Sequence, residues 1–338
     1  MKFSWSEINN HIMGNFDLFI ASASYEERCL SLAQNIPHEK INRAVIFYLH
    51  DFEEYVATNL LRLEAVFKTN NISNELVELF HNKPIESSDR IIRCLDNYLL
   101  DGTVREVIID ITAFTHEISL LLFMLFKRRY TEVSVTFAYS NAADYDYVEN
   151  EAYHSSDKWL SKGIGDIRSI LGYPGDLLPT KKTHLIVIVG YEYDRALSVI
   201  SDMEPTSLSL GFGKSASFTT EIQNDRGKHY GAREHFDEVV RDSMAVVPKS
   251  RTYTFDVSCN DPRQAYRDIK QHLEQTNASI KDKNIVLFAM NNKLSTLGVG
   301  LFALERDDIQ LCYAPALLYN YSNYSMPGTN CYLFNLSE

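Results

Sequence analysis

Apolar and polar positions along this chain fall into blocks that predict strands and helices in regular succession. Short continuous apolar runs such as VREVIID are typical of strands buried on both faces, and the segments between them have the spacing of amphipathic helices. The strands predicted in the first half are Leu18–Ala21, Ala44–Leu49, Glu75–Leu79, Glu106–Ile111 and Val133–Tyr139. The helices predicted between them span residues 25–36, 52–68, 86–100 and 116–129.

The second half of the chain repeats this order of elements. Its predicted strands are Leu185–Val189, Ser207–Gly211, Thr252–Val257, Ile285–Ala289 and Ile309–Tyr313. Its predicted helices lie near residues 192–203, 229–244, 261–275 and 293–303. Because alternating strands and helices pack as parallel sheets covered by helices on both faces, we predict an α/β fold.

Two segments of the chain are also similar in sequence. Residues 17–33 read DLFIASASYEERCLSLA, and residues 184–200 read HLIVIVGYEYDRALSVI. Each contains an apolar strand, a turn rich in Tyr and Glu, and an acid–Arg pair that opens a helix. Alignment of Arg28 with Arg195 pairs Glu27 with Asp194. We therefore predict two tandem Rossmann-like parallel-sheet halves related by internal duplication.

The predicted organisation is a first Rossmann-like half over residues 1–140, a connector over 141–183 and a second Rossmann-like half over 184–338. The connector contains the Pro and Gly residues of GYPGDLLPTKK, which are typical of a linking segment. The Tyr-rich C-terminal tail, YAPALLYNYSNYSMPGTNCYLF, is expected to fold over the second half. The polar segment 214–233 interrupts the repeat and is either a lid that closes on a ligand or a surface insertion.

Composition and charge narrow the class of protein. The net charge of −12 argues against a protein that coats DNA or RNA, because such binding depends on many Lys and Arg contacts to phosphates. The five cysteines are widely spaced without a CxxC pair, which is typical of free thiols in a reducing compartment. The N-terminus lacks the apolar run of a signal peptide, and no apolar stretch approaches the roughly 20 residues of a membrane span. We therefore expect a cytoplasmic protein that does not enter a membrane.

Polar loops are predicted after the first and fourth strands of each half, at the edge where open parallel sheets bind ligands. The candidate ligand-binding residues are Glu27, Arg28, Thr112, Thr115 and His116 in the first half and Asp194, Arg195, Asn292, Lys293 and Ser295 in the second. In this interpretation Arg28, Arg195 and Lys293 neutralise phosphate, while the hydroxyl groups and Asn292 orient the ligand. The alternative is structural: Thr112, Thr115 and Asn292 are suitable helix N-caps, and the acid–Arg pairs suit first helical turns.

Known motifs for catalysis, metals and cofactors are missing from the sequence. It contains no GxGxxG or GxxxxGK[ST] loop, no HExxH or HxxxH pair and no GxSxG elbow, so no catalytic, metal or cofactor site is assigned. Cys29 lies beside Arg28, which favours a thiolate, but the pattern around it is that of a buried helix face. Glu26, Glu27 and Asp110 form the basis of an alternative function, metal-assisted phosphodiester cleavage or nucleoside processing.

The segment from Ile285 to Ser295, a strand, a polar loop and then Lys-x-Ser at the start of a helix, resembles the ligand-binding loop of CRISPR-associated Rossmann fold (CARF) domains. Lys293 and Ser295 match the pattern, and His116 and Ser119 occupy roughly corresponding places in the first half, where His replaces the family's Lys. CARF domains are sensors that bind cyclic oligonucleotides across a two-fold interface. The resemblance implies a nucleotide-sensing or regulatory module of a bacterial antiphage system, in which the two halves mimic the family's homodimer.

A third function class is a scaffold subunit that docks a larger effector. The chain has 20 Tyr and 18 Phe, and Tyr313, Tyr319, Tyr321 and Tyr324 of the tail either stack on bases or pack against protein.

The segment IIDITAFT partly resembles the phosphoribosyltransferase loop, but only Asp110 stands where that family has two acids. The leading prediction is therefore a sensor of a nucleotide-like small molecule that works with a protein partner or as a homo-oligomer.

Overall fold

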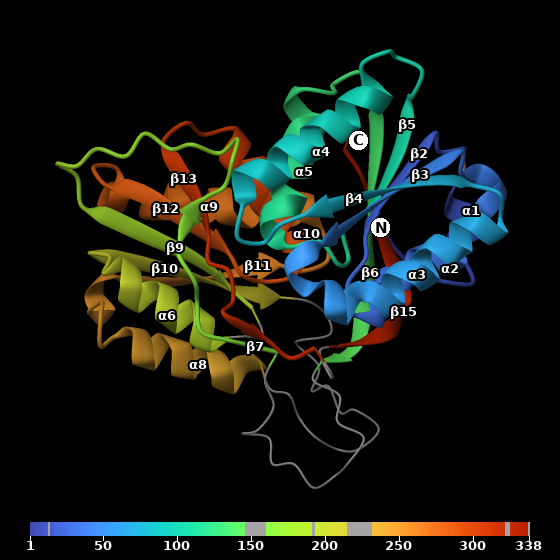
Figure 1. Ribbon diagram of the computed structural model, residues 1–338. Helices are drawn as coiled ribbons and strands as arrows, with labels where there is room; N and C mark the ends of the chain where they lie inside the picture. The colour runs from blue at the N-terminus through green and yellow to red at the C-terminus, as the bar shows by residue number, and fades with distance from the viewer. Residues whose placement is uncertain (13, 146–159, 191–192, 215–231, 322–324, 337–338) are drawn as a thin grey trace, which may run out of the picture. The chain divides into compact units, whose positions relative to one another are not determined.

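A computed structural model of the chain describes residues 1–12, 14–145, 160–190, 193–214, 232–321 and 325–336. The chain divides into two compact units (Figure 1). The first unit consists of Met1–Leu160 and Asn320–Glu338, and the second consists of Ser161–Tyr319. Each unit has its own largely parallel sheet and its own helices, so the fold is α/β in both.

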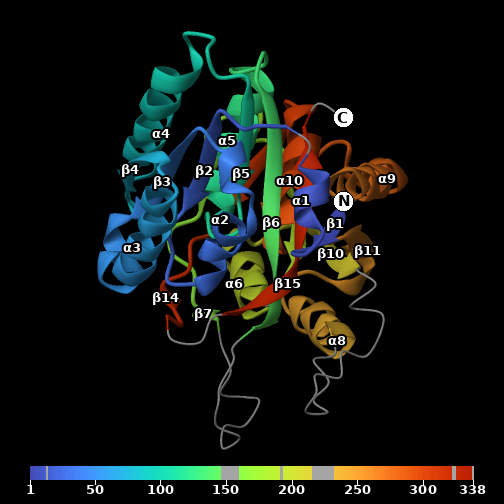
Figure 2. The same cartoon turned by 90° about the vertical axis from the view of Figure 1, so that its right-hand side faces the viewer.

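The sheet of the first unit contains seven strands in the order β1-β15-β6-β5-β2-β3-β4. The parallel strands are β2 (Leu18–Ser22), β3 (Arg43–Leu49), β4 (Ser73–Leu79), β5 (Glu106–Asp110) and β6 (Ser134–Tyr145). At one edge, β15 (Ser325–Asn335) pairs antiparallel with β6, and β1 (Lys2–Ser4) pairs antiparallel with β15 (Figure 2). Numbered in chain order, the parallel strands lie as 3-2-1-4-5, which is the Rossmann-like order.

Helices cover both faces of this sheet (Figure 1). They are α1 (Ile8–His11), the 3-10 helix η1 (Glu27–Leu30), α2 (Ser31–Asn35), η2 (His38–Lys40), η3 (His50–Phe52), α3 (Glu53–Thr69), α4 (Pro84–Leu99) and α5 (His116–Arg128). On one face, α1, α2 and α3 bury a core that includes Phe19 of β2 and Phe67 of α3. On the other face, α5 packs Phe123 against Phe137 of β6, because the apolar run of α5 must be covered on most of its sides.

The sheet of the second unit contains six strands in the order β11-β10-β9-β12-β13-β8. Its parallel strands are β9 (Thr183–Val189), β10 (Ser207–Lys214), β11 (Thr252–Ser258), β12 (Asn284–Ala289) and β13 (Ile309–Tyr313), and they too lie as 3-2-1-4-5. The short strand β8 (Arg168–Ser169) pairs antiparallel with β13 at the edge. A separate pair is formed by β7 (Ser161–Lys162) and β14 (Leu318–Tyr319).

The helices of the second unit are α6 (Tyr193–Met203), α8 (Ala232–Ser243), η5 (Lys249–Arg251), α9 (Pro262–Ile280) and α10 (Lys293–Leu304). A core between α6, α8 and the sheet includes Leu185, Val187 and Val239. The helices α9 and α10 approach each other closely at Gly298, where an added Cβ would lie 2.5 Å from the Cβ of Ala265. Only glycine fits that contact without displacing a helix.

The structure confirms the strands and helices that the hydrophobic pattern predicts in both halves, with ends that differ by a few residues. The helix predicted over residues 25–36 begins as the 3-10 helix η1 and continues as α2. The shared order of parallel strands shows a Rossmann-like arrangement in each unit. The duplication inferred from the sequence stays a prediction. No helix in the described part of the chain is both long and apolar enough to cross a membrane.

Only the first part of the C-terminal tail, up to Tyr319, belongs to the second unit as expected; the rest belongs to the first unit. Its strand β15 pairs along β6 in the first sheet, from Ser325 opposite Tyr145 to Asn335 opposite Thr136. The tail packs there because β6 would otherwise present unpaired backbone groups at the edge of the sheet. The predicted connector 141–183 likewise supplies the end of β6 to the first unit and β7 and β8 to the second.

Candidate functional site

The strand order of each sheet reverses direction at one point, between β2 and β5 in the first unit and between β9 and β12 in the second. In open α/β sheets, ligands bind at this switch point, beyond the carboxyl ends of the strands. The candidate residues lie in the loops or first helical turns that follow these four strands. Their positions therefore agree with the ligand-binding edge expected from the sequence.

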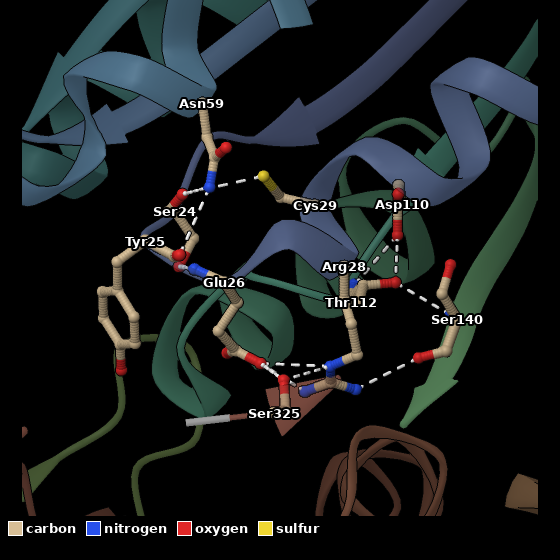
Figure 3. Close-up of polar contacts among 10 residues, drawn as sticks. All are labelled: Ser24, Tyr25, Glu26, Arg28, Cys29, Asn59, Asp110, Thr112, Ser140 and Ser325. Carbon is tan, nitrogen blue, oxygen red and sulfur yellow. Dashed lines mark hydrogen bonds and ion pairs between the residues drawn. The ribbon is translucent and has the colours of Figure 1, made fainter. Parts of the chain in front are cut away.

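Arg28 is enclosed in a network of protein groups (Figure 3). Its side chain forms an ion pair of 2.6 Å with Glu26, and only 4% of the residue is exposed. Its Nε donates to the Ser325 hydroxyl at 2.8 Å, and its Nη1 donates to the Ser140 carbonyl at 3.1 Å. The guanidinium therefore joins the loop after β2 to β6 and β15, and these bonds must break before it contacts a phosphate.

Asp110 and Thr112 form a second buried network beside Arg28 (Figure 3). Oδ1 of Asp110 accepts hydrogen bonds from the Thr112 amide at 3.0 Å and from the Thr112 hydroxyl, which itself accepts from the Ser140 amide at 2.9 Å. Oδ2 of Asp110 has no hydrogen-bond partner among the described residues. Burial raises the pKa of Asp110 to about 7, against the opposing effects of the Thr112 hydrogen bonds and the charge of Arg28. Thr112 thus links β5 to β6 and is not a helix cap.

Thr115 is the N-cap of α5, as the structural alternative predicts. Its hydroxyl accepts a hydrogen bond of 3.2 Å from the Ile118 amide. Ser119 is fully buried and donates its hydroxyl proton to the Thr115 carbonyl at 2.8 Å. His116 is half-buried in the first turn of α5, at the switch point. Among the loop residues after β5, His116 thus places a partly exposed basic side chain at the switch point.

Glu27 points to solvent and pairs with Arg62 of α3, a residue that the sequence interpretation did not select. The two side chains are 60% and 45% exposed, and Oε1 of Glu27 lies 2.7 Å from Nη1 of Arg62. Arg62 also donates to the side chain of Asn59 at 3.2 Å. Asn59 is buried and donates to the carbonyl groups of Ser24 and Tyr25 at 2.9 and 3.2 Å. An exposed ion pair of this kind is weak, so Arg62 can exchange Glu27 for a ligand anion at little cost.

Aromatic side chains lie next to this loop. Tyr55 of α3 and Tyr321 of the tail are stacked, with ring centroids 3.8 Å apart and planes inclined by 7°. Tyr25 approaches Tyr321 edge-on at 5.1 Å, and Phe52 lies 5.9 Å from it. The tail tyrosines predicted as a group are thus divided: Tyr321 belongs to the first unit, while Tyr313 and Tyr319 lie in β13 and β14 of the second. Tyr324 is outside the described residues.

In the second unit, Asp194 and Arg195 lie in the first turn of α6. Arg195 is half-buried and donates from Nη2 to the Ala314 carbonyl at 2.6 Å, while Asp194 is exposed. Most of the polar segment 214–233 lies outside the described residues. Arg195 therefore anchors α6 to the loop after β13.

Asn292 is the N-cap of α10 and also joins two loops. Its Oδ1 accepts from the Ser295 amide at 3.0 Å, and its Nδ2 donates to the Cys259 carbonyl at 2.7 Å. Ser295 is fully buried and donates its hydroxyl proton to the Asn292 carbonyl at 2.9 Å. Lys293 is half-buried at the start of α10. Of the three residues predicted in this loop, Lys293 alone carries a charge to the switch point.

The acids proposed for metal-assisted cleavage are not assembled for it. Glu26 is held by Arg28, Asp110 is 2% exposed, and Glu27 points to solvent. Within the described residues, no group of three or more His, Cys, Asp or Glu side chains has the arrangement of a metal site. Burial raises the pKa of Cys29 to about 12, so its thiol is an unreactive part of the core, as its helix-face pattern predicts.

The signal that points to Arg62 is present in the sequence but is interpretable only with the structure. The buried stripe of α3 runs through Val56, Asn59, Leu63 and Phe67, so a polar residue interrupts an otherwise apolar face. A buried Asn requires hydrogen-bond partners, and here they are the carbonyl groups of the loop after β2. That contact brings Arg62 to the loop. The pairing of Arg62 with Glu27 cannot be deduced from the spacing of residues along α3.

The chain was also compared with known proteins. Neither the protein-family models nor the curated proteins gave a match. The CARF resemblance therefore rests on the loops and strand order alone.

Proposed function

We propose that this protein is a nucleotide-sensing or regulatory module that binds a nucleotide-like anionic ligand at the switch point of its Rossmann-like units. The observation that carries the proposal is the coincidence of fold and chemistry. Both sheets have the strand order 3-2-1-4-5, and the polar loops follow the central strands of that order. This is the edge at which open α/β sheets bind nucleotides.

The residues best suited to contact the ligand are basic side chains that are partly or fully exposed at this edge of the sheets. His116 and Arg62 are such residues in the first unit, and Lys293 is one in the second. Arg62 and Lys293 supply positive charge for phosphate, while Arg28, Thr112 and Asn292 hold the loops in position. The assignment of phosphate binding thus moves from Arg28 to Arg62.

The CARF resemblance of the Lys293 loop supports a cyclic oligonucleotide as the ligand and a bacterial antiphage system as the setting. The net charge of −12 fits this proposal, since a small anion needs a local cation and not a basic surface. A protein partner or a second copy of the chain is the expected receiver of the signal.

The test is thermal unfolding of the full chain with AMP, ATP, cyclic di-adenylate and cyclic tetra-adenylate. One of these nucleotides should raise the unfolding temperature without being converted to product. Arg62→Gln and Lys293→Gln should each lower the affinity for that nucleotide by about tenfold or more, which is the scale of one lost charged hydrogen bond. Lys68→Gln and Lys281→Gln remove exposed cations elsewhere in the same units and should leave binding unchanged.

Two outcomes contradict the proposal in different ways. If no nucleotide changes the unfolding temperature, ligand sensing is wrong and the scaffold alternative is favoured. If a nucleotide is cleaved in the presence of a divalent cation and Asp110→Asn abolishes the cleavage, the protein is an enzyme.

A further inference from the structure

Tyr55 and Tyr321 form a stacked aromatic pair in the first unit. Their rings lie 3.8 Å apart and are nearly parallel, and Tyr25 closes one side of Tyr321 edge-on. Tyr55 is nevertheless 48% exposed. A large aromatic side chain that is half exposed and already oriented by a stacked partner offers a flat surface for a further ring.

This aromatic surface lies at the ligand-binding edge of the first sheet. Tyr25 follows β2, Phe52 and Tyr55 follow β3, and Tyr321 comes from the tail. The loop after β2 is held against the same helix, because Asn59 donates to the carbonyl groups of Ser24 and Tyr25. The helix that carries Tyr55 is therefore bonded directly to the switch-point loop.

A cation lies on the same face of α3. Residues 55, 59 and 62 are spaced by four and three positions, so they follow one another along one side of the helix. Helical side chains lean toward the helix N-terminus, and the contact of Arg62 with Asn59 shows that its guanidinium does so. The positive charge is therefore brought one turn closer to Tyr55 than the position of Arg62 in the sequence implies.

We propose that Tyr55 and Tyr321 form a stacking surface for a nucleobase, and that Arg62 binds the phosphate of the same nucleotide. This inference rests on the proposed function and specifies how its first site recognises the ligand. A planar ring on Tyr55 and an anion on Arg62 together select a nucleotide over inorganic phosphate and over a ribose phosphate without a base. Stacking tolerates any base, because every base has a π-face.

The test measures AMP and ribose 5-phosphate binding to the full chain by calorimetry. It is carried out in a Lys293→Gln background, so that the remaining affinity reports on the first unit. AMP should bind more tightly than ribose 5-phosphate. Tyr55→Ala should lower the affinity for AMP by about tenfold and leave the affinity for ribose 5-phosphate unchanged, since base stacking contributes on this scale. Tyr55→Phe keeps the ring and should retain AMP binding.

Leu61→Ala is the matched control, because Leu61 is an exposed apolar residue of the same helix. It should leave both ligands unaffected. If AMP binds but is indifferent to Tyr55→Ala and to Arg62→Gln, the stacking surface is wrong while the proposed function stands. If the chain without the Lys293 substitution binds neither AMP nor any cyclic adenylate, the proposed function is wrong and this inference is wrong with it.

Discussion

Arg28 donates a hydrogen bond of 2.8 Å to Ser325, 297 positions further along the chain. Ser325 is the first residue of β15, and its hydroxyl also donates to Glu26 at 2.6 Å. The loop after β2 is therefore bonded directly to the C-terminal strand. A residue selected from the sequence as a phosphate ligand instead connects the start of the first unit to its end.

The first prediction concerns the stability of this connection. Arg28→Met should destabilise the first unit by about 3–5 kcal/mol, because it leaves the largely buried carboxylate of Glu26 without its ion-pair partner. The indole of Trp5 donates to the Gly328 carbonyl in β15, so urea unfolding followed by Trp5 fluorescence in a Trp159→Phe background reports on this strand. The double variant Arg28→Met/Glu26→Gln removes both charges and should be less destabilised than Arg28→Met alone. Equal stability of Arg28→Met and the parent protein would show that the network is dispensable.

Asp110 gives a prediction for pH dependence. Burial raises its pKa to about 7 in the folded protein, against about 3.9 for an unperturbed Asp. Between these two pH values the folded state keeps a proton on Asp110 that the unfolded state releases. The contribution of Asp110 to stability is therefore complete below about pH 4 and is lost as the pH rises through 7. Asp110→Asn stays neutral at every pH. Its free energy of unfolding relative to the parent protein should therefore be higher at pH 8 than at pH 5, and a difference independent of pH would contradict a protonated Asp110.

The second unit should respond to acid in the opposite direction. His184 and His272 are both hydrogen-bonded to Ser209, and burial lowers their pKa values to about 3 and about 4. Below about pH 6.5 both histidines become protonated in the unfolded chain but stay neutral in the folded unit. Their contribution to stability is therefore complete above that pH and falls as the pH decreases toward 4. Each such histidine contributes a slope of about 1.4 kcal/mol per pH unit in this range.

The measurement is chemical unfolding of the full chain between pH 4 and 8. The variant His272→Phe keeps a ring against Phe255, which stacks on His272 at 4.0 Å, but removes one titrating group. Its stability should fall less steeply with acid than that of the parent protein. A slope unchanged by the substitution would mean that His272 is protonated in the folded state.

Substitutions of Thr115 distinguish a helix-capping role of its hydroxyl from a ligand-binding role. Its hydroxyl caps α5, so Thr115→Ala should destabilise the first unit by about 1 kcal/mol and Thr115→Ser should restore most of that loss. Because the hydroxyl is engaged by the Ile118 amide, we expect nucleotide affinity at constant temperature to be the same in both variants. A nucleotide that binds Thr115→Ala at least tenfold more weakly than Thr115→Ser would assign the hydroxyl to the ligand.

The order of the elements and the edge that carries the polar loops could be predicted from the sequence, because both depend on local patterns. A buried parallel strand must be apolar throughout, and the loop that follows it must supply polar caps for the next helix. The role of each polar residue could not be predicted in the same way. Arg28 and Glu27 are neighbours, yet one is enclosed by Glu26, Ser140 and Ser325 and the other is exposed.

The tail is the clearest case of a decision made by tertiary structure. Its position in the chain favoured the second half. Pairing with the edge strand β6 and the hydrogen bond from Arg28 place its last strand, β15, in the first unit.

The doubled pattern of strands, helices and acid–Arg turns is a property of the sequence alone, because hydrophobic periodicity and helix signals act over a few residues. Which cation remains available to a ligand depends on contacts between segments far apart in the chain. Burial of Arg28 by β15 and exposure of Arg62 on α3 are outcomes of packing, which depends on contacts among segments from the whole chain.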